Sequence, residues 1–277
     1  MITLRQPNIT FIGGGNMAAA LINGLVNGLV NCFTAAANIR VIDVNPQTLQ
    51  QLSQRFGVTV DCSVTNAVAG CDILILAVKP QQIAPVLQDI AAQLKHQLVV
   101  SIAAGIRTAE LSAGLQGYTA IVRAMPNMPA LIGRGMTGMF AMPGVSAEQQ
   151  LHADTVMAAV GKTMWLQAEQ SLDAVTGVSG SGPAFVFHFI EALEKAALEV
   201  GLNAAESKLL ALETVAGAAQ LALQSDDEVA LLRERVTSKG GTTFAGLNSL
   251  QQDDFCAVIA RAVKAATNRS RELGDTC

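Results

Sequence analysis

The chain has 277 residues, of which 51% are hydrophobic and only 14% are charged, with a net charge of −4. This length allows one large domain or two ordinary ones, and the slight acidity without a basic run argues against a nucleic-acid surface. The first residues lack a signal-peptide pattern, and no apolar run reaches the ~18 residues of a membrane span, so we expect a cytoplasmic protein.

The first 166 residues predict an α/β domain. Short apolar runs alternate with helical stretches such as 16–26 and 46–56, a pattern typical of βαβ units around a parallel sheet. The expected strands are 9–13, 39–43, 58–60, 72–78, 98–103, 119–124, 136–142 and 163–166.

Residues 167–277 contain no convincing strand and predict an all-α domain. Expected helices cover 183–200, 204–224, a segment capped by Asp226 or Asp227 that ends near Val236, and 243–273. Several of these helices are apolar on more than one face, which one small domain cannot bury, so we expect a homodimer or a larger homo-oligomer.

Three glycines separate the first strand from the first helix. The segment fits the GxGxx(G/A) fingerprint, in which glycines permit a tight turn and let a pyrophosphate approach the backbone at a helix N-terminus. A tight turn without a ligand is the simpler alternative, but the strand and helix on either side favour a dinucleotide. The predicted cofactor-binding residues are Gly13, Gly14, Gly15, Asn16, Met17 and Ala18.

Two further segments follow predicted strands and so belong to the edge where ligands bind in such sheets. Asp43 ends the second strand, where an acidic residue accepts hydrogen bonds from the ribose and repels a 2′-phosphate, which favours NAD; a plain turn residue is the alternative. The fourth strand is followed by Ala77, Val78, Lys79 and Pro80, which we also expect at the cofactor.

Glycine-rich segments interrupt the helical half at 178–183 and 236–247, each just before a helix. Their hydroxyls and free backbone N–H groups suit a small anion such as a carboxylate, although ordinary helix capping explains many such segments. The histidines His96, His152 and His188 have no ligand partners at metal spacing, so we expect no metal. The scattered cysteines, which predict free thiols in a reducing compartment, are Cys32, Cys62, Cys71, Cys256 and Cys277.

Taken together, the motifs FIGGGNMA, ILAVKPQ, RAMPNMPA, DAVTGVSGSGPAFVF and VTSKGGTTFAGL resemble those of the pyrroline-5-carboxylate reductases in order and spacing. The resemblance covers essentially the whole chain. It implies an N-terminal Rossmann domain (1–166) and an all-α dimerisation and substrate domain (167–277), similar to the C-terminal half of 6-phosphogluconate dehydrogenases. It also implies an intertwined dimer, sometimes assembled into a decamer.

The implied activity is the reduction of 1-pyrroline-5-carboxylate to L-proline by NADPH or NADH. By this resemblance Ser238 and the N–H groups of Thr242 and Thr243 hold the substrate carboxylate, and the Thr243 hydroxyl lies beside the ring nitrogen as the catalytic group. Gly240, Gly241 and Glu169 complete the implied substrate site.

Two positions depart from the family pattern. Lys239 stands where relatives often have proline, and we expect its side chain to face solvent. Asp43 stands where many relatives have groups that suit NADPH, so NADPH is the first choice on family grounds and Asp43 favours NADH. Two rival functions are a β-hydroxyacid dehydrogenase, which needs a lysine one turn into the long helix where this chain has none before Lys195, and a non-catalytic nucleotide-binding protein.

Overall fold

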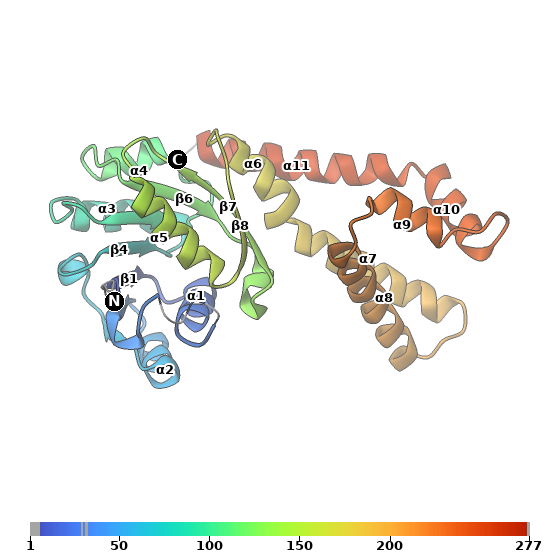
Figure 1. The fold of residues 1–277 in the computed structure, drawn as a ribbon, viewed down its shortest axis with the longest axis horizontal. Coiled ribbons are helices and arrows are strands. Elements are labelled where there is room, and N and C mark those ends of the chain that lie inside the picture. Colours follow the sequence, from blue (N-terminus) through green and yellow to red (C-terminus); the bar gives the residue numbers. More distant parts are fainter. Residues whose placement is uncertain (1–5, 29, 31–32, 276–277) are drawn as a thin grey trace. The chain divides into compact units, whose positions relative to one another are not determined.

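The computed structural model describes residues 6–28, 30 and 33–275 (Figure 1). Two of the five cysteines, Cys32 and Cys277, lie outside the described residues, as does the start of the N-terminal segment. The chain divides into two compact units: unit 1 is Met1–Gly180 with Ala266–Cys277, and unit 2 is Ser181–Ala265. The expected boundary between residues 166 and 167 stays a prediction about domains.

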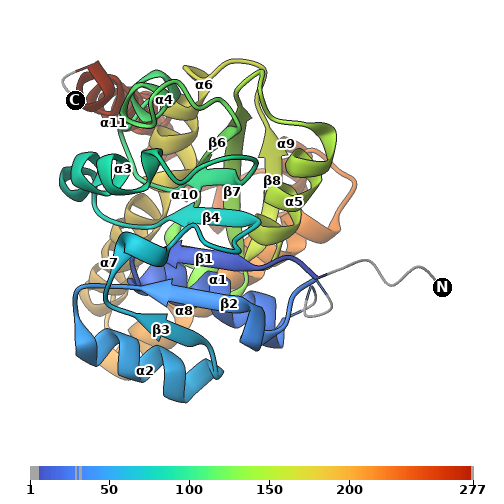
Figure 2. The same cartoon turned by 90° about the vertical axis from the view of Figure 1, so that its left-hand side faces the viewer.

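Unit 1 contains an eight-stranded sheet in the order β3-β2-β1-β4-β5-β6-β7-β8 (Figure 2). All eight strands lie where the sequence predicts them, within a few residues. Their bounds are β1 Ile9–Ile12, β2 Ile39–Ile42, β3 Thr59–Asp61, β4 Ile73–Leu76, β5 Leu98–Ser101, β6 Ile121–Met125, β7 Gly135–Ala141 and β8 Gly161–Trp165.

The sheet departs from the expected parallel arrangement at one place, because β7 pairs antiparallel with β6. Between these strands lie only residues 126–134, which hold the 3₁₀ turn Met128–Ile132. A parallel connection needs a crossover of a dozen or more residues, usually with a helix. That condition is met between β7 and β8, where helix α5 (Ala147–Ala158) intervenes and the pairing is parallel.

The helices of unit 1 cover the sheet on both faces. Alternation along the strands sends Ile73 and Ile75 into one apolar cluster and Leu74 and Leu76 into another. The first cluster packs against α1 (Asn16–Asn27), α2 (Pro46–Phe56) and α5, and the second against α3 (Ile83–Ala91) and α4 (Thr108–Gly114). This double burial explains why these strands are apolar throughout.

The chain leaves the sheet through α6 (Ser171–Val175) and the π-helical turn Thr176–Gly180. Helices α7 (Gly182–Glu199), α8 (Ala204–Gln224), α9 (Val229–Arg235) and α10 (Thr242–Gln252) then form unit 2. Helix α11 (Phe255–Asp275) begins in unit 2 and ends in unit 1. Within the described residues, no helix is both long enough and apolar enough to cross a bilayer.

Two details of the helical half differ from expectation. The helix predicted over 243–273 is interrupted at Asp253 and Asp254, because Asp254 adopts a left-handed conformation with φ 52°, which short polar residues tolerate better than most. The cap predicted at Asp226 or Asp227 is also wrong, since Glu228 precedes α9 as its N-cap. The Asp227 carboxylate instead pairs with Arg235 in the last turn of that helix.

Candidate active site

The turn between β1 and α1 can be built only with glycine at its first position. Gly13 has φ 101°, and a Cβ there would lie 2.6 Å from the Ala77 carbonyl oxygen. A Cβ on Gly14 would meet the side chains of Leu52 and Thr48 at 2.9 Å. The absence of side chains at Gly13 and Gly14 therefore lets the loop lie close to β4 and α2.

Gly15 differs from its neighbours, because a Cβ on it would find no described heavy atom within 4 Å. Gly15 is also the N-cap of α1 and has no side chain with which to cap the helix. The first N–H groups of α1, including those of Asn16, Met17 and Ala18, have no partner within the helix. Open space beside uncapped N–H groups and a positive helix end suits a phosphate.

Both carboxylate oxygens of Asp43 accept backbone hydrogen bonds, one of them from the glycine loop. Its Oδ2 accepts from the Gly14 N–H at 2.7 Å, and its Oδ1 accepts from the Asn45 N–H at 2.8 Å. The side chain therefore stabilises the glycine turn and the start of α2 together. Each oxygen keeps a second acceptor position, so hydrogen bonding to a ribose hydroxyl is still open to it.

Beside Asp43 lies a cavity of about 300 Å³, within the size range of ligand sites. Aliphatic side chains from β2, the β3–β4 connection and α3 form much of its wall, a surface suited to a flat apolar ring. The lining residues are Ile12, Gly13, Ile42, Asp43, Val44, Cys62, Val64, Val78, Gln82, Pro85, Val86 and Asp89.

The segment after β4 reaches the same edge. The Ala77 N–H donates to the Ile12 carbonyl at 2.8 Å, which brings the ends of β4 and β1 together. Val78 lines the cavity, and the exposed Lys79 precedes a 3₁₀ turn that starts at Pro80. The structure thus collects the predicted residues of the glycine loop, Asp43 and this segment at one edge of unit 1.

The loop Ser238–Thr243 lies in unit 2, between α9 and α10. Gly240 has φ 72°, and the Gly241 N–H donates to the Ser238 carbonyl at 3.0 Å, which closes a tight turn. A Cβ on Gly241 would lie 2.4 Å from the Ser238 hydroxyl oxygen, so that hydroxyl rests against the start of α10.

Helix α10 begins at Thr242, and its N-cap Gly241 has no side chain to satisfy the first N–H groups. Thr242 and Thr243 are both exposed. Their N–H groups, with the Ser238 hydroxyl beside them, form a helix end that suits an anion. Lys239 is exposed as expected.

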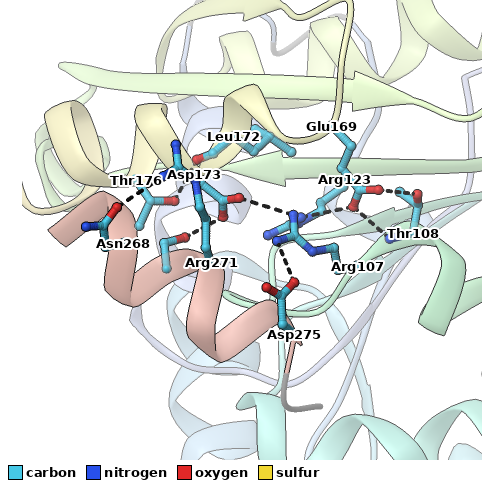
Figure 3. A network of polar contacts seen from close by, with 11 residues as sticks. Arg107, Thr108, Arg123, Glu169, Leu172, Asp173, Thr176, Asn268, Arg271 and Asp275 are labelled. Atoms are coloured by element: carbon cyan, nitrogen blue, oxygen red, sulfur yellow. Dashed lines mark hydrogen bonds and ion pairs between the residues drawn. The ribbon is translucent and has the colours of Figure 1, made fainter. Parts of the chain in front are cut away.

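Glu169 lies in a partly buried network of unit 1 (Figure 3). Its Oε1 accepts from the Thr108 N–H at 2.7 Å and from Arg123 Nη1 at 2.9 Å, while its Oε2 accepts from the Thr108 hydroxyl at 2.7 Å. The carboxylate therefore caps α4 and neutralises Arg123, whose side chain is only 4% exposed. Its predicted role at the substrate stays a prediction.

Two models of known protein families match this chain. The family model for pyrroline-5-carboxylate reductase dimerisation matches residues 169–273, and one for the coenzyme F420-dependent NADP oxidoreductases matches residues 8–105. A pyrroline-5-carboxylate reductase of Pseudomonas aeruginosa is 45% identical over 274 residues, 98% of each chain. One of Pasteurella multocida is 38% identical, again over 98% of each.

This chain belongs to the pyrroline-5-carboxylate reductase family. The predicted family and fold class are thereby confirmed, and membership excludes the rival β-hydroxyacid dehydrogenase. Among solved structures, a pyrroline-5-carboxylate reductase of Coxiella burnetii superposes with a TM-score of 0.91 at 36% identity, covering 97% of this chain and 99% of that one. The pyrroline carboxylate reductase of Plasmodium falciparum, solved with NADP bound, gives a TM-score of 0.85 at 29% identity over 98% and 99%.

Sequence reasoning missed the residues that hold the segment after the sheet. Asp173 is 1% exposed and accepts from the Ser270 hydroxyl at 2.7 Å and from Arg107 at 3.2 Å. Burial lowers the pKa of Arg107, but Asp173 and Asp275 raise it, and the net pKa is raised. The network joins α6 to the end of α11 (Figure 3).

For the neighbouring pair of Arg123 with Glu169, a signal was present in the sequence. Arg123 stands in an apolar strand, and an arginine is almost never fully buried unless it is paired. The sequence therefore indicated that a buried carboxylate must exist, but it could not say which of the acidic residues provides it.

Proposed function

We propose that this chain reduces 1-pyrroline-5-carboxylate to L-proline by hydride transfer from NADPH, the last step of proline biosynthesis. The observation that carries the proposal is the 45% identity to the Pseudomonas aeruginosa reductase over 98% of both chains. The glycine turn of unit 1 and the loop 238–243 of unit 2 support it, since the first suits a pyrophosphate and the second suits a carboxylate.

The residues of unit 1 fit a dinucleotide. The open space at Gly15 and the free start of α1 suit the pyrophosphate, and the cavity beside Asp43 suits the adenine end. Val78 lines this cavity, and Lys79 and Pro80 lie at the same edge, with the Lys79 side chain exposed. NADPH is the first choice because the Plasmodium falciparum relative holds NADP, whereas Asp43 favours NADH.

The loop 238–243 fits the substrate. The Ser238 hydroxyl and the N–H groups of Thr242 and Thr243 bind the carboxylate, while Gly240 and Gly241 shape the turn. The Thr243 hydroxyl lies beside the ring nitrogen and is the proposed catalytic group. Glu169 is also proposed as a substrate residue; in unit 1 its two oxygens already accept hydrogen bonds from Arg123 and Thr108.

The reaction requires little acid–base catalysis from the protein. Bound NADPH supplies the hydride that reduces C5 of the pyrroline ring. The imine is most electrophilic when its nitrogen is protonated, and that nitrogen becomes the amine of proline. The chain must fix the carboxylate, orient the ring and hold a hydrogen bond at the nitrogen. Such positioning can supply roughly 7–11 kcal/mol in ideal cases.

We further propose that the enzyme is cytoplasmic and self-associates as a homodimer or a larger homo-oligomer, up to a decamer. The match of residues 169–273 to a dimerisation family supports self-association. So do the exposed apolar side chains of unit 2, among them Phe187, Leu209 and Leu223.

The proposal is tested by following the loss of reduced-nicotinamide absorbance with pyrroline-5-carboxylate, using NADPH and NADH in parallel. We expect saturable turnover, with proline as the product. A six-membered cyclic imine serves as a second substrate and measures how strictly ring size is selected. Saturable NADPH binding without turnover of either imine would instead favour the non-catalytic alternative.

A further inference from the structure

The side chain of Asn127 joins two segments that are distant in the sequence. Asn127 follows β6 after one intervening residue, and its Nδ2 donates to the Ser179 carbonyl at 3.1 Å and to the Ser179 hydroxyl at 3.0 Å. Its Oδ1 accepts from the Met136 N–H at 2.9 Å. The carboxamide thus links the end of β6, the start of β7 and the π-helical turn 176–180, all within unit 1.

Close packing at the same place supports this link. A Cβ on Gly180 would lie 2.9 Å from Met125 Cε at the end of β6, and a Cβ on Gly138 would lie 2.9 Å from Val175 Cγ1. The chain from Val175 to Gly180 is therefore pressed against β6 and β7. The chain just before this segment is anchored by Glu169 and Asp173, as described above.

The position of this link in the sheet gives it a functional meaning. Strands β1, β4, β5 and β6 are parallel, so the end of β6 lies at the same edge as the glycine turn. In a doubly wound sheet the half that begins with β1 takes one mononucleotide and the other half takes the second. The glycine turn and the Asp43 cavity suit the adenine half, which leaves the β4–β6 half for the nicotinamide.

We infer that Asn127 is a positioning residue for hydride transfer: its carboxamide holds the turn 176–180 at the edge where the nicotinamide ring lies. The inference rests on the proposed function. Because its Nδ2 and Oδ1 are engaged with the chain itself, Asn127 acts through the turn and not as a ligand of the substrate. A π-helical turn of this kind is common at functional sites, and a rigid wall beside the ring keeps it at reacting distance.

The test is the single-turnover rate of NADPH oxidation in Asn127→Asp at saturating pyrroline-5-carboxylate. The aspartate keeps an acceptor for the Met136 N–H, but it replaces the donor with an oxygen that repels the Ser179 carbonyl. We expect the rate constant to fall about 10- to 100-fold, with full amplitude and with NADPH affinity within about twofold of wild type. Asn23→Asp, the same change on the exposed face of α1, should match wild type.

A merely structural role predicts a different result, namely a smaller amplitude from fewer folded molecules with an unchanged rate constant. That result, or an unchanged rate in folded Asn127→Asp, overturns the inference. If Asn127→Asp does not fold, Asn127→Ala decides, because it removes the donor to Ser179 and the acceptor for the Met136 N–H without adding a charge: a slower rate constant at full amplitude supports the inference, and an unchanged one overturns it. Failure of the proposed function is distinguishable, since wild type itself would then not oxidise NADPH.

Discussion

Units 1 and 2 have similarly apolar sequences, but unit 1 buries its apolar side chains and unit 2 leaves many of them exposed. In unit 1, Phe11, Ile73 and Ile75 are fully buried between helices on both faces of the sheet. In residues 181–265, all of which the structure describes, only Ser207 and Ala211 are buried. Leu209 and Leu223 remain 61% and 67% exposed.

This difference shows that the two units are stabilised in different ways. Unit 1 closes its own core, as a sheet covered on both faces must. The helices of unit 2 have local support, for example the reciprocal hydrogen bonds of Asn203 and Glu206 at the start of α8, but each leaves apolar surface open. Fully burying one such side chain is worth about 1.5–3 kcal/mol, so we expect a partner subunit that covers these side chains to stabilise unit 2.

The largest predicted effect comes from placing charges on the exposed apolar face of α8. Leu209→Asp with Leu212→Asp should weaken self-association by roughly 3–6 kcal/mol, two to four orders of magnitude, with loss of reductase activity. Sedimentation measured alongside activity checks this. Leu151→Asp, at a leucine that is 64% exposed on α5 of unit 1, is the control and should still assemble. A double variant that still assembles and is active would contradict the view that the apolar face of α8 is covered by a partner subunit.

A second prediction separates the chemical contributions of the units. Thr243→Ala should lower kcat/KM on the order of 10²-fold, a typical loss for one positioned hydrogen-bonding group. NADPH affinity should not change, because the residues proposed to bind it lie in unit 1. Thr243→Ser keeps the hydroxyl and should recover most of the activity. Wild-type kinetics in a folded Thr243→Ala would remove this residue from the mechanism.

A third prediction compares thiols inside and outside the core. Burial raises the pKa of Cys71 to about 11, so at pH 8 its thiolate is roughly 100-fold scarcer than that of an ordinary cysteine. A variant that keeps only Cys71 should therefore react with a thiol reagent at least that much more slowly than one that keeps only Cys62, which is exposed. Equal rates would show that the core around Cys71 opens readily.

The smallest predicted effect concerns unit 1 alone. Asp43→Asn removes the charge that repels a 2′-phosphate while keeping an acceptor for the glycine turn. The ratio of kcat/KM for NADPH to that for NADH should rise about tenfold, which corresponds to about 1.4 kcal/mol. Steady-state kinetics with both cofactors measure it, and self-association should stay as in wild type. A ratio that does not move would mean that Asp43 serves only the turn.

Much of the fold was predictable because local pattern and burial agree. The apolar strands and the turn at Gly13 follow from periodicity and from glycine's tolerance of positive φ. The antiparallel direction of β7 was missed because the shortness of the β6–β7 connection decides it. The residues of the strand itself do not. The break at Asp254 was missed because apolar spacing continues across it. Glu169 was picked out by its place in a motif, but its partners Thr108 and Arg123 are distant in the sequence.

By itself, the sequence determined the family, the order of the strands along the chain and the segments proposed to bind cofactor and substrate, because these depend on residue type and short-range spacing. Only the tertiary structure decided which groups meet. It ties Asp43 to the glycine turn, Glu169 to Arg123, and Asn127 to Ser179. Such pairings depend on the path of the backbone through space, which a local pattern does not contain.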